Sequence, residues 1–308
     1  MIDFVKVDCS SLSLEGLQSN PLIETNVSVD SNTGEIRGLK NWQSAYQCSA
    51  YGDLNFSHDP RYSKTILSGS LPKFLNDGKH NNYNFSAFGL SKSIDLLTFL
   101  FGVNTSTDQL RNIEISITIL IDVNSNLIMD NYIFHSKAGA SIMEFNIEHF
   151  KGGAIKKTLA RSQYRIKSYD QNRRHNKPNR IINGKEVWRF RFEVNFKKME
   201  QINKLDIRVL DDLRIKSKRD KLLQLLLGEW DAIFLFDPNL RKEDFENDEL
   251  YYRLRDAKEW KKMSSHQRAR AKKSYNSVLE RSGYNTKQII RDAMEQVWYR
   301  LSTEVTLF

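Results

Sequence analysis

The chain has 308 residues and a formal charge of +9, with 47 Lys and Arg against 38 Asp and Glu. A content of 40% hydrophobic and 11% aromatic residues excludes a disordered, collagenous or fibrous protein and predicts one large domain or two ordinary ones. The longest apolar stretches, such as Leu222–Leu227 and Ala232–Phe236, are far shorter than the roughly 20 residues that a membrane span requires, so no membrane partner is expected.

The amino terminus and the cysteines predict a cytoplasmic protein. Asp3 and Asp8 lie where a signal peptide would need a long apolar region. Cys9 and Cys48 are too few to build a disulfide framework in a chain of this length. We therefore expect a reducing compartment.

The first third of the chain predicts short strands followed by one helix. Strands are predicted at 2–8 and at Thr65–Ser70, with further short strands and loops in the polar segment 20–62. A helix is predicted from Ser86, a favourable N-cap residue, to Phe101, where Gly102 ends it.

Three strands with strict alternation follow, at Asn112–Leu120, Gln163–Asp170 and Trp188–Phe196. Alternating apolar and polar residues are typical of a strand with one buried face. The polar faces carry Glu114 on the first strand, Arg165, Lys167 and Tyr169 on the second, and Arg191 and Glu193 on the third. Tyr164 falls on the apolar side and is predicted to be a core residue.

The remaining patterns complete a mixed α+β body and an all-helical tail. In the body we predict strands at Leu127–Phe134 and Ala154–Leu159 and helices at about 139–150, 199–203, 210–213 and 218–227, the last ended by Gly228. Beyond Pro238, helices are predicted at about 244–262, 264–282 and 285–301, with Ser264 and Asn285 as N-caps and Gly283 as a stop.

The polar faces predict a metal site if the three strands lie side by side. Glu114 and Glu193 would then share one divalent cation, and ligation by oxygen alone favours Mg²⁺ or Mn²⁺ over Zn²⁺. Tyr169 is the candidate nucleophile for a phosphodiester beside that metal, with Lys167 or Arg191 stabilising the developing charge. A solvated sheet face with cross-strand ion pairs is the alternative.

The net charge is distributed unevenly. Residues 1–150 carry −6, whereas residues 151–221 carry +14. A field of this kind attracts polyanions, and the aromatic residues interleaved with it are of the type that stacks on bases. A surface with surplus solvated lysines is the alternative.

The tail carries a second basic segment, QRARAKKSY at 267–275. It predicts either a helix-turn-helix that contacts DNA phosphates or a helical hairpin that packs on the core with a basic outer face. Nucleotide hydrolysis is not indicated, because the chain has neither a Walker-type motif nor GxGxxG, and the histidines lack metal-site spacing.

Several segments in order resemble the phage and plasmid replication proteins of the gene II/X family, the filamentous-phage-like initiators of rolling-circle replication. The similar segments are SGSLPKFLNDGKHNNYNFSAF (68–88), LRNIEISI (110–117), YRIKSYDQ (164–171), WRFRFEVNFKKM (188–199), LDIRVLDDL (205–213) and WDAIFLFD (230–237). They cover most of residues 2–237. The segment at 265–285 is similar to a helical region near the end of the phage initiators.

The resemblance implies an α+β fold, in which a central antiparallel sheet of about five strands has helices on one face. A nicking domain would occupy 1–238, and a helical region at 239–308 would bind DNA or a partner. A more distant similarity to Rep_trans plasmid initiators assigns Glu114 and Glu193 as metal ligands and Tyr169 as nucleophile. Two positions depart from that pattern: Thr118 stands where a further acid is found, and Gln171 replaces a lysine. Basic assistance would then fall to Lys167, Arg173 or Arg174.

The implied activity is a metal-dependent DNA nickase that starts rolling-circle replication through a 5′-phosphotyrosyl intermediate, with Tyr169 and Lys167 as catalytic residues. The implied DNA-binding residues are Lys156, Lys157, Arg161, Arg165, Arg173, Arg174, Arg191, Arg268, Arg270, Lys272 and Lys273. Expected partners are origin DNA, as single strand, hairpin or duplex, and a host helicase, with the protein acting as a monomer or homodimer. A non-catalytic copy-control protein that binds DNA and an RNA-binding or RNA-processing protein are the alternatives.

Overall fold

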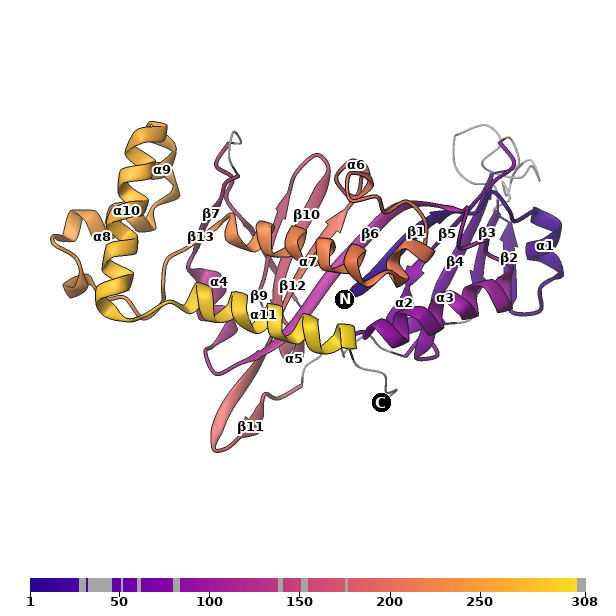
Figure 1. Ribbon diagram of the computed structural model, residues 1–308, viewed down its shortest axis with the longest axis horizontal. Coiled ribbons are helices and arrows are strands. Elements are labelled where there is room, and N and C mark those ends of the chain that lie inside the picture. Colours follow the sequence, from indigo (N-terminus) through magenta and orange to yellow (C-terminus); the bar gives the residue numbers. More distant parts are fainter. Residues whose placement is uncertain are drawn as a thin grey trace.

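A long antiparallel sheet with helices packed against it gives the protein an α+β fold (Figure 1). The computed structural model describes residues 1–27, 32, 46–50, 52–59, 62–79, 84–137, 141–150, 155–174 and 177–303. Within these residues eleven strands pair in the order β2-β3-β4-β5-β1-β6-β12-β10-β9-β8, with β11 added to β12. The strands are β1 (Ile2–Asp8), β2 (Ile23–Val27), β3 (Tyr46–Ala50), β4 (Leu54–Asp59), β5 (Lys64–Ser70), β6 (Gln109–Ile121), β8 (Asn146–His149), β9 (Ile155–Ala160), β10 (Tyr164–Asp170), β11 (Arg180–Ile182) and β12 (Lys185–Phe196). A second sheet pairs β7 (Tyr132–His135) with β13 (Ile233–Leu235).

The sheet is wider than the five strands expected, which corrects that prediction. Strands β2 to β5 are joined in sequence and extend the sheet beyond β1 on one side, while β9 and β8 extend it beyond β10 on the other. Each added antiparallel strand satisfies the free backbone groups of the previous edge. The short strands at the two ends of the sheet carry too few alternating residues to be counted from the sequence.

The central strands confirm the predicted alternation. Ile113 and Ile115 on β6 are fully buried in the main core, whereas Glu114 between them points to the other face. The register places Lys167 on β10 opposite Glu193 on β12. Residues directly opposite each other in an antiparallel pair share a face, so the polar residues of the three strands gather on one side.

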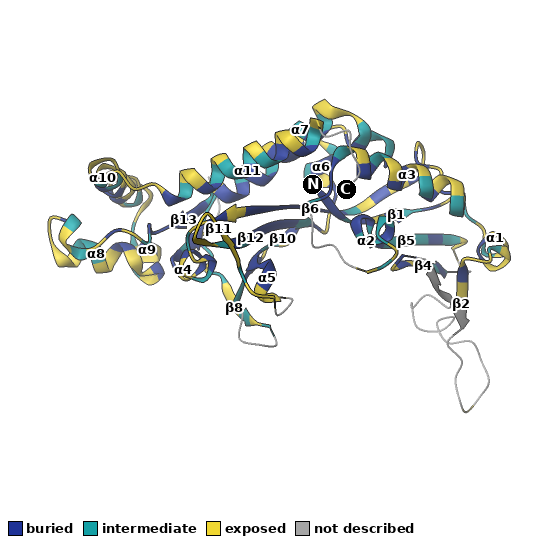
Figure 2. Ribbon diagram, turned by 90° about the horizontal axis from the view of Figure 1, so that it is seen from below, coloured by how far each residue is buried: buried dark blue, intermediate teal, exposed yellow. Residues whose placement is uncertain are grey.

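Helices cover the apolar face of the sheet. The long helices α3 (Ala87–Phe101), α7 (Lys216–Asp231) and α11 (Thr286–Thr303) lie together on this side (Figure 2). The predicted caps of α3 are confirmed, since Ser86 Oγ accepts from the amide of Gly89 and Gly102 adopts a φ of +71°. The shorter helices are α1 (Leu14–Ser19), α2 (Leu71–Leu75), α4 (Ser125–Asp130), α5 (Gln171–Arg174), α6 (Glu200–Asn203), α8 (Asp248–Arg255), α9 (Ala257–Lys262) and α10 (Ser265–Ser282), with 3₁₀ turns at Asp211–Arg214 and Lys242–Asp244.

Two predictions in the middle of the chain are wrong. The strand expected at Leu127–Phe134 is helix α4 followed by β7. The side chain of Asn124 caps the first turn of the helix, and the helical conformation buries Ile128 and Met129 in the core. The helix expected at 139–150 is strand β8 over its last residues, where it pairs with β9, and residues 138–140 lie outside the described part. Short apolar runs do not distinguish helix from strand by periodicity alone.

Two helix boundaries also differ from the prediction. Helix α7 does not end at Gly228 but continues to Asp231, which allows Trp230 to enter the core. The helix expected at 244–262 is divided into α8 and α9 by Asp256, whose carboxylate accepts from the amide of Lys258 at 2.7 Å. A local cap thus competes with helix continuation.

The buried apolar residues form two clusters. The larger one lies between the sheet and α3, α7 and α11, and includes Trp230 and Trp298. The smaller one joins β7 and β13 to α8, α9 and α10 around Trp260. The division of the chain at 238/239 stays a prediction. Over the described residues, no helix combines the length and apolar character needed to cross a bilayer.

Candidate active site on the polar face of the sheet

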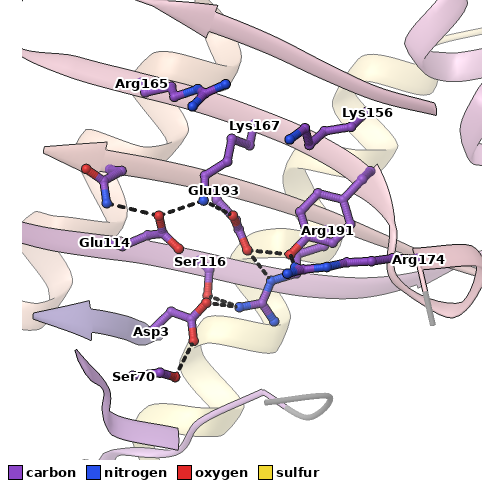
Figure 3. Close-up of polar contacts among 12 residues, drawn as sticks. Asp3, Ser70, Glu114, Ser116, Lys156, Arg165, Lys167, Arg174, Arg191 and Glu193 are labelled. Atoms are coloured by element: carbon purple, nitrogen blue, oxygen red, sulfur yellow. Dashed lines mark hydrogen bonds and ion pairs between the residues drawn. The ribbon is translucent and has the colours of Figure 1, made fainter. Parts of the chain in front are cut away.

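Three carboxylates from three adjacent strands meet on the face of the sheet away from the long helices (Figure 3). Asp3 lies on β1, Glu114 on β6 and Glu193 on β12, and each offers an oxygen within 4.8 Å of the other two. Their exposed fractions are 5%, 7% and 1%. The structure therefore brings together both predicted metal ligands and adds a third acid.

Asp3 was missed as a site residue because a bulge decides where it points. In a regular strand Asp3 would share the buried face of Val5 and Val7. The register between β1 and β6 shifts between Ile2, which faces Ile115, and Phe4, which faces Glu114. The extra residue in the bulge is Asp3, and its carboxylate turns to the side of the other acids. An acid between apolar residues at the start of a strand was the only signal available in the sequence.

Two basic side chains lie between the carboxylates. Lys167 Nζ is 2.7 Å from Oε2 of Glu114 and 2.7 Å from Oε2 of Glu193. Arg191 donates from Nε to Oε1 of Glu193 at 2.6 Å and from Nη2 to Oδ2 of Asp3 at 2.7 Å. Two of the three negative charges in the cluster are therefore compensated by the chain itself.

The two glutamates differ in proton affinity. Burial raises the pKa of Glu114 to about 7, and the negative charge of Glu193 adds to this while Lys167 opposes it. Burial acts in the same direction on Glu193, but Arg191 and Lys167 outweigh it and hold the pKa of Glu193 below its ordinary value. Glu193 is therefore the residue that keeps its negative charge, and Glu114 is the one that takes up a proton first.

Tyr169 contacts this cluster through its hydroxyl group. The hydroxyl donates to Oε1 of Glu193 at 2.6 Å and accepts from Nη1 of Arg174 at 2.6 Å. The side chain is 1% exposed and is covered by Phe150, 5.7 Å away between ring centroids, and by the Arg174 guanidinium. Burial and then the charge of Glu193 raise the pKa of Tyr169 well above 10, although Arg191 and Arg174 oppose this. Tyr164, by contrast, is buried on the apolar face against Phe196, as predicted.

The oxygen donors suit a hard divalent cation, with one condition. Three carboxylates form the all-oxygen set that Mg²⁺ or Mn²⁺ prefers. The ammonium group of Lys167 bridges Glu114 and Glu193, so a cation shared by those two residues requires this side chain to move aside. Its side chain is 22% exposed, which leaves a path toward solvent. Once Lys167 is withdrawn, the acids and Arg191 carry a net −2, which matches the charge of the cation.

Only some of the predicted DNA-binding residues lie at this site. Lys156, Arg165 and Arg174 lie beside it on the same face (Figure 3). Lys156 and Arg165 both pair with Glu148. Arg173 follows on α5, with its guanidinium 4.8 Å from the ring centroid of Trp188.

Three other predicted DNA-binding residues are buried or bonded to other groups of the protein. Lys157 is opposite Ser168 on the other face of the sheet and is buried. Arg161 donates to Nδ1 of His135 at 3.0 Å, and Arg191 is enclosed by the acids. The tail residues Arg268, Arg270, Lys272 and Lys273 lie on α10, at a distance from the sheet site (Figure 1).

Comparison with known proteins gives a likeness at the level of the backbone. No protein-family model matches the sequence, and no curated protein matches it. A solved structure, the rolling circle replication initiator protein from Geobacillus stearothermophilus, aligns with a TM-score of 0.41 and 12% sequence identity over 81% of this chain and 89% of that chain. A likeness of this degree assigns neither an activity nor a residue role to the chain.

Proposed function

We propose that the protein is a metal-dependent DNA nickase that initiates rolling-circle replication. The observation that carries the proposal is the hydrogen bond from the Tyr169 hydroxyl to Glu193, a member of a cluster of three carboxylates flanked by Lys167 and Arg191. A nucleophile, a group that orients it, an all-oxygen ligand set and basic groups are what a transesterification at phosphorus requires.

The reaction uses each of these groups in turn. The Tyr169 oxygen attacks the scissile phosphorus and loses its proton to water, while Glu193, the carboxylate that it already contacts, orients the hydroxyl group. The new bond joins this oxygen to phosphorus, the bond from phosphorus to the 3′ oxygen breaks, and the 3′ oxygen takes up one proton from water to leave as a hydroxyl. Bound Mg²⁺ or Mn²⁺, held by Asp3, Glu114 and Glu193, would polarise the phosphate. Lys167, released from the acids, stabilises the charge on the phosphate oxygens.

The burial of Tyr169 sets a requirement for substrate entry. Phe150 and Arg174 cover the ring, and Arg174 also donates to the hydroxyl. A phosphate that replaced the tyrosine as partner of Arg174 would draw this guanidinium away from the hydroxyl. The proposal thus gives Arg174 two successive partners, first the hydroxyl of Tyr169 and then the DNA.

The DNA is expected to cross the polar face near Lys156, Arg165, Arg173 and Arg174, with further contacts from the basic residues of α10. Origin DNA, in single-stranded or duplex form, is the proposed substrate, and a helicase is the proposed partner. A cytoplasmic location and a monomer or homodimer complete the proposal.

A non-catalytic protein that binds DNA and controls copy number is the second candidate. One observation favours it. Side chains of the protein already contact the proposed metal ligands and nucleophile, because Lys167 bridges two of the acids and Arg174 donates to the hydroxyl of Tyr169. In this case the cluster would stabilise the sheet, and only the basic surface would function.

A covalent-capture assay separates these candidates. The full chain is incubated with single-stranded origin DNA and Mn²⁺, and a protein–DNA band is sought on a denaturing gel. The nickase predicts a band that is absent in Tyr169→Phe and retained in Tyr164→Phe, a matched change on the opposite face. Tight binding without a band supports copy control, and a preference for RNA over DNA supports an RNA-binding protein. A band that persists in Tyr169→Phe and is lost in Tyr164→Phe would show that the assigned nucleophile is wrong.

A further inference from the structure

A polar cavity of about 310 Å³ is lined by residues of β13, α10 and the first turns of α11. This volume is at the lower end of the range of small-molecule sites, about 300 to 1,000 Å³. Polar and charged side chains supply much of its wall: Asp231, Lys272, Asn276, Asn285, Lys287 and Arg291.

The acids of this cavity are already engaged by groups of the chain. The carboxylate of Asp231 accepts from Nε of Arg291, at 3.1 Å and 3.2 Å to its two oxygens. Asp237, which also lines the cavity, accepts from the backbone amide of Thr286 at 2.6 Å, at the start of α11. Neither acid is therefore the main partner of a lysine.

The two lysines have no carboxylate of their own. Lys287 Nζ donates to the backbone oxygens of Asp231 and Ile233 at 2.7 Å and 2.6 Å, both of which are neutral acceptors. Lys272 Nζ lies 5.9 Å from the ring centroid of Phe134, and no acidic side chain in the described part of the chain pairs with it. Because an ammonium group has three N–H donors, Lys287 retains one and Lys272 retains all three.

The electrostatics of Lys287 agree with this geometry. Burial lowers its pKa to about 8; Asp231 opposes the shift, and the positive charge of Lys272 adds to it. Both lysines line the same cavity. An anion between them would compensate both positive charges and accept the remaining hydrogen bonds.

We propose that this cavity, the β13–α10–α11 pocket, binds a phosphate group, and that the group is a backbone phosphate of DNA. The pocket offers no free aromatic face for a nucleotide base, because Phe234 packs on Trp260 at 4.5 Å and on Tyr275 at 5.0 Å between ring centroids. Arg291, on α11, adds a further positive group to the wall of the pocket. This choice of ligand rests on the DNA-binding part of the proposed function.

The test measures binding of labelled single-stranded and duplex oligonucleotides to the full chain across a salt series. Lys272→Gln should raise Kd about tenfold or more, as expected for loss of a charge-assisted hydrogen bond, and lower the salt slope by about one. Asn276→Asp, which places a negative charge at the exposed wall, should weaken binding at least as much. Lys221→Gln, the same charge change at an exposed position of α7, is the matched control and should alter Kd by less than about twofold.

A second measurement uses inorganic phosphate against chloride at equal ionic strength. Phosphate should raise the Tm of the wild type and leave that of Lys272→Gln unchanged. If the wild type binds the oligonucleotides, both variants bind equally well and phosphate has no effect on Tm, the pocket is wrong while the DNA-binding proposal stands. If no oligonucleotide binds but phosphate stabilises only the wild type, the pocket is supported with a free phosphate compound as its ligand, and the proposed function fails.

Discussion

The hydroxyl of Thr118 on β6 donates a hydrogen bond to Oε1 of Gln171 on α5, with 3.2 Å between the two oxygens, and both side chains are buried. From the resemblance to plasmid initiators, an acid and a lysine are expected at these two positions. The structure has two neutral side chains in contact there instead. An acid at position 118 or a lysine at position 171, introduced alone, would bury an uncompensated charge and lower the free energy of unfolding.

Introducing these charges one at a time should therefore lower the free energy of unfolding. Gln171→Lys places an ammonium group against Thr118, whose hydroxyl already accepts from Nη1 of Arg191 at 3.3 Å. We expect the free energy of unfolding to fall by about 3 kcal/mol, the cost of an uncompensated buried charge. Addition of Thr118→Glu should recover most of this loss. Urea denaturation of both single variants and the double variant measures the coupling, and strictly additive effects would contradict the pairing.

Removal of Lys167 should strengthen metal binding. In Lys167→Met the ammonium group no longer competes for the oxygens of Glu114 and Glu193, so the Kd for Mn²⁺, followed by electron paramagnetic resonance, should fall about tenfold. Without metal the variant should have a lower Tm than the wild type, because Glu114 and Glu193 lose their shared counter-ion. Lys156→Met is the control, since Lys156 pairs with Glu148 instead. Equal Mn²⁺ affinity in the two variants would contradict competition by Lys167.

Asp3 should act as a metal ligand although it lies between two apolar residues at the start of β1. Asp3→Asn removes one carboxylate and should raise the Kd for Mn²⁺ about tenfold or more. It also breaks the ion pair with Arg191 and should reduce the free energy of unfolding by about 3 kcal/mol. Asp8→Asn, on the same strand but paired with Lys64 and Arg111, should leave Mn²⁺ affinity unchanged. Calorimetric titration of both variants distinguishes a ligand from a residue that only pairs with arginine.

Lys287 should make stability depend on pH above neutrality. Its pKa is lowered from 10.5 to about 8, so between these values the unfolded chain holds the proton more strongly than the folded chain. The free energy of unfolding should then rise with pH, by at most about 1.4 kcal/mol per unit for this group. Below pH 8 both states are protonated and the contribution is constant. Subtracting the curve of Lys287→Met, which lacks the group, isolates the effect, and parallel curves would show that Lys287 is not perturbed.

Much of the central fold could be predicted because local patterns agree with tertiary packing there. The alternation in β6, β10 and β12 identified which face is buried, and the caps at Ser86 and Gly102 set the limits of α3. Prediction failed where a contact distant in sequence decides between alternatives. Residues 146–149 became a strand because β9 offered an edge, and α7 passed Gly228 because Trp230 packs in the core.

By itself, the sequence determined that Glu114, Glu193 and Tyr169 each lie on the polar face of their own strand, because a strand period of two leaves no other arrangement once one face is apolar. The pairing of β6, β12 and β10 then placed these three faces side by side. Only the tertiary structure decided which further groups join them. A bulge turns Asp3 toward the acids, and the pairing of β10 with β12 places Lys167 between them. The physical reason is that alternation along one strand fixes the side on which a residue lies, whereas its neighbours depend on register and bulges, which are set by packing between strands.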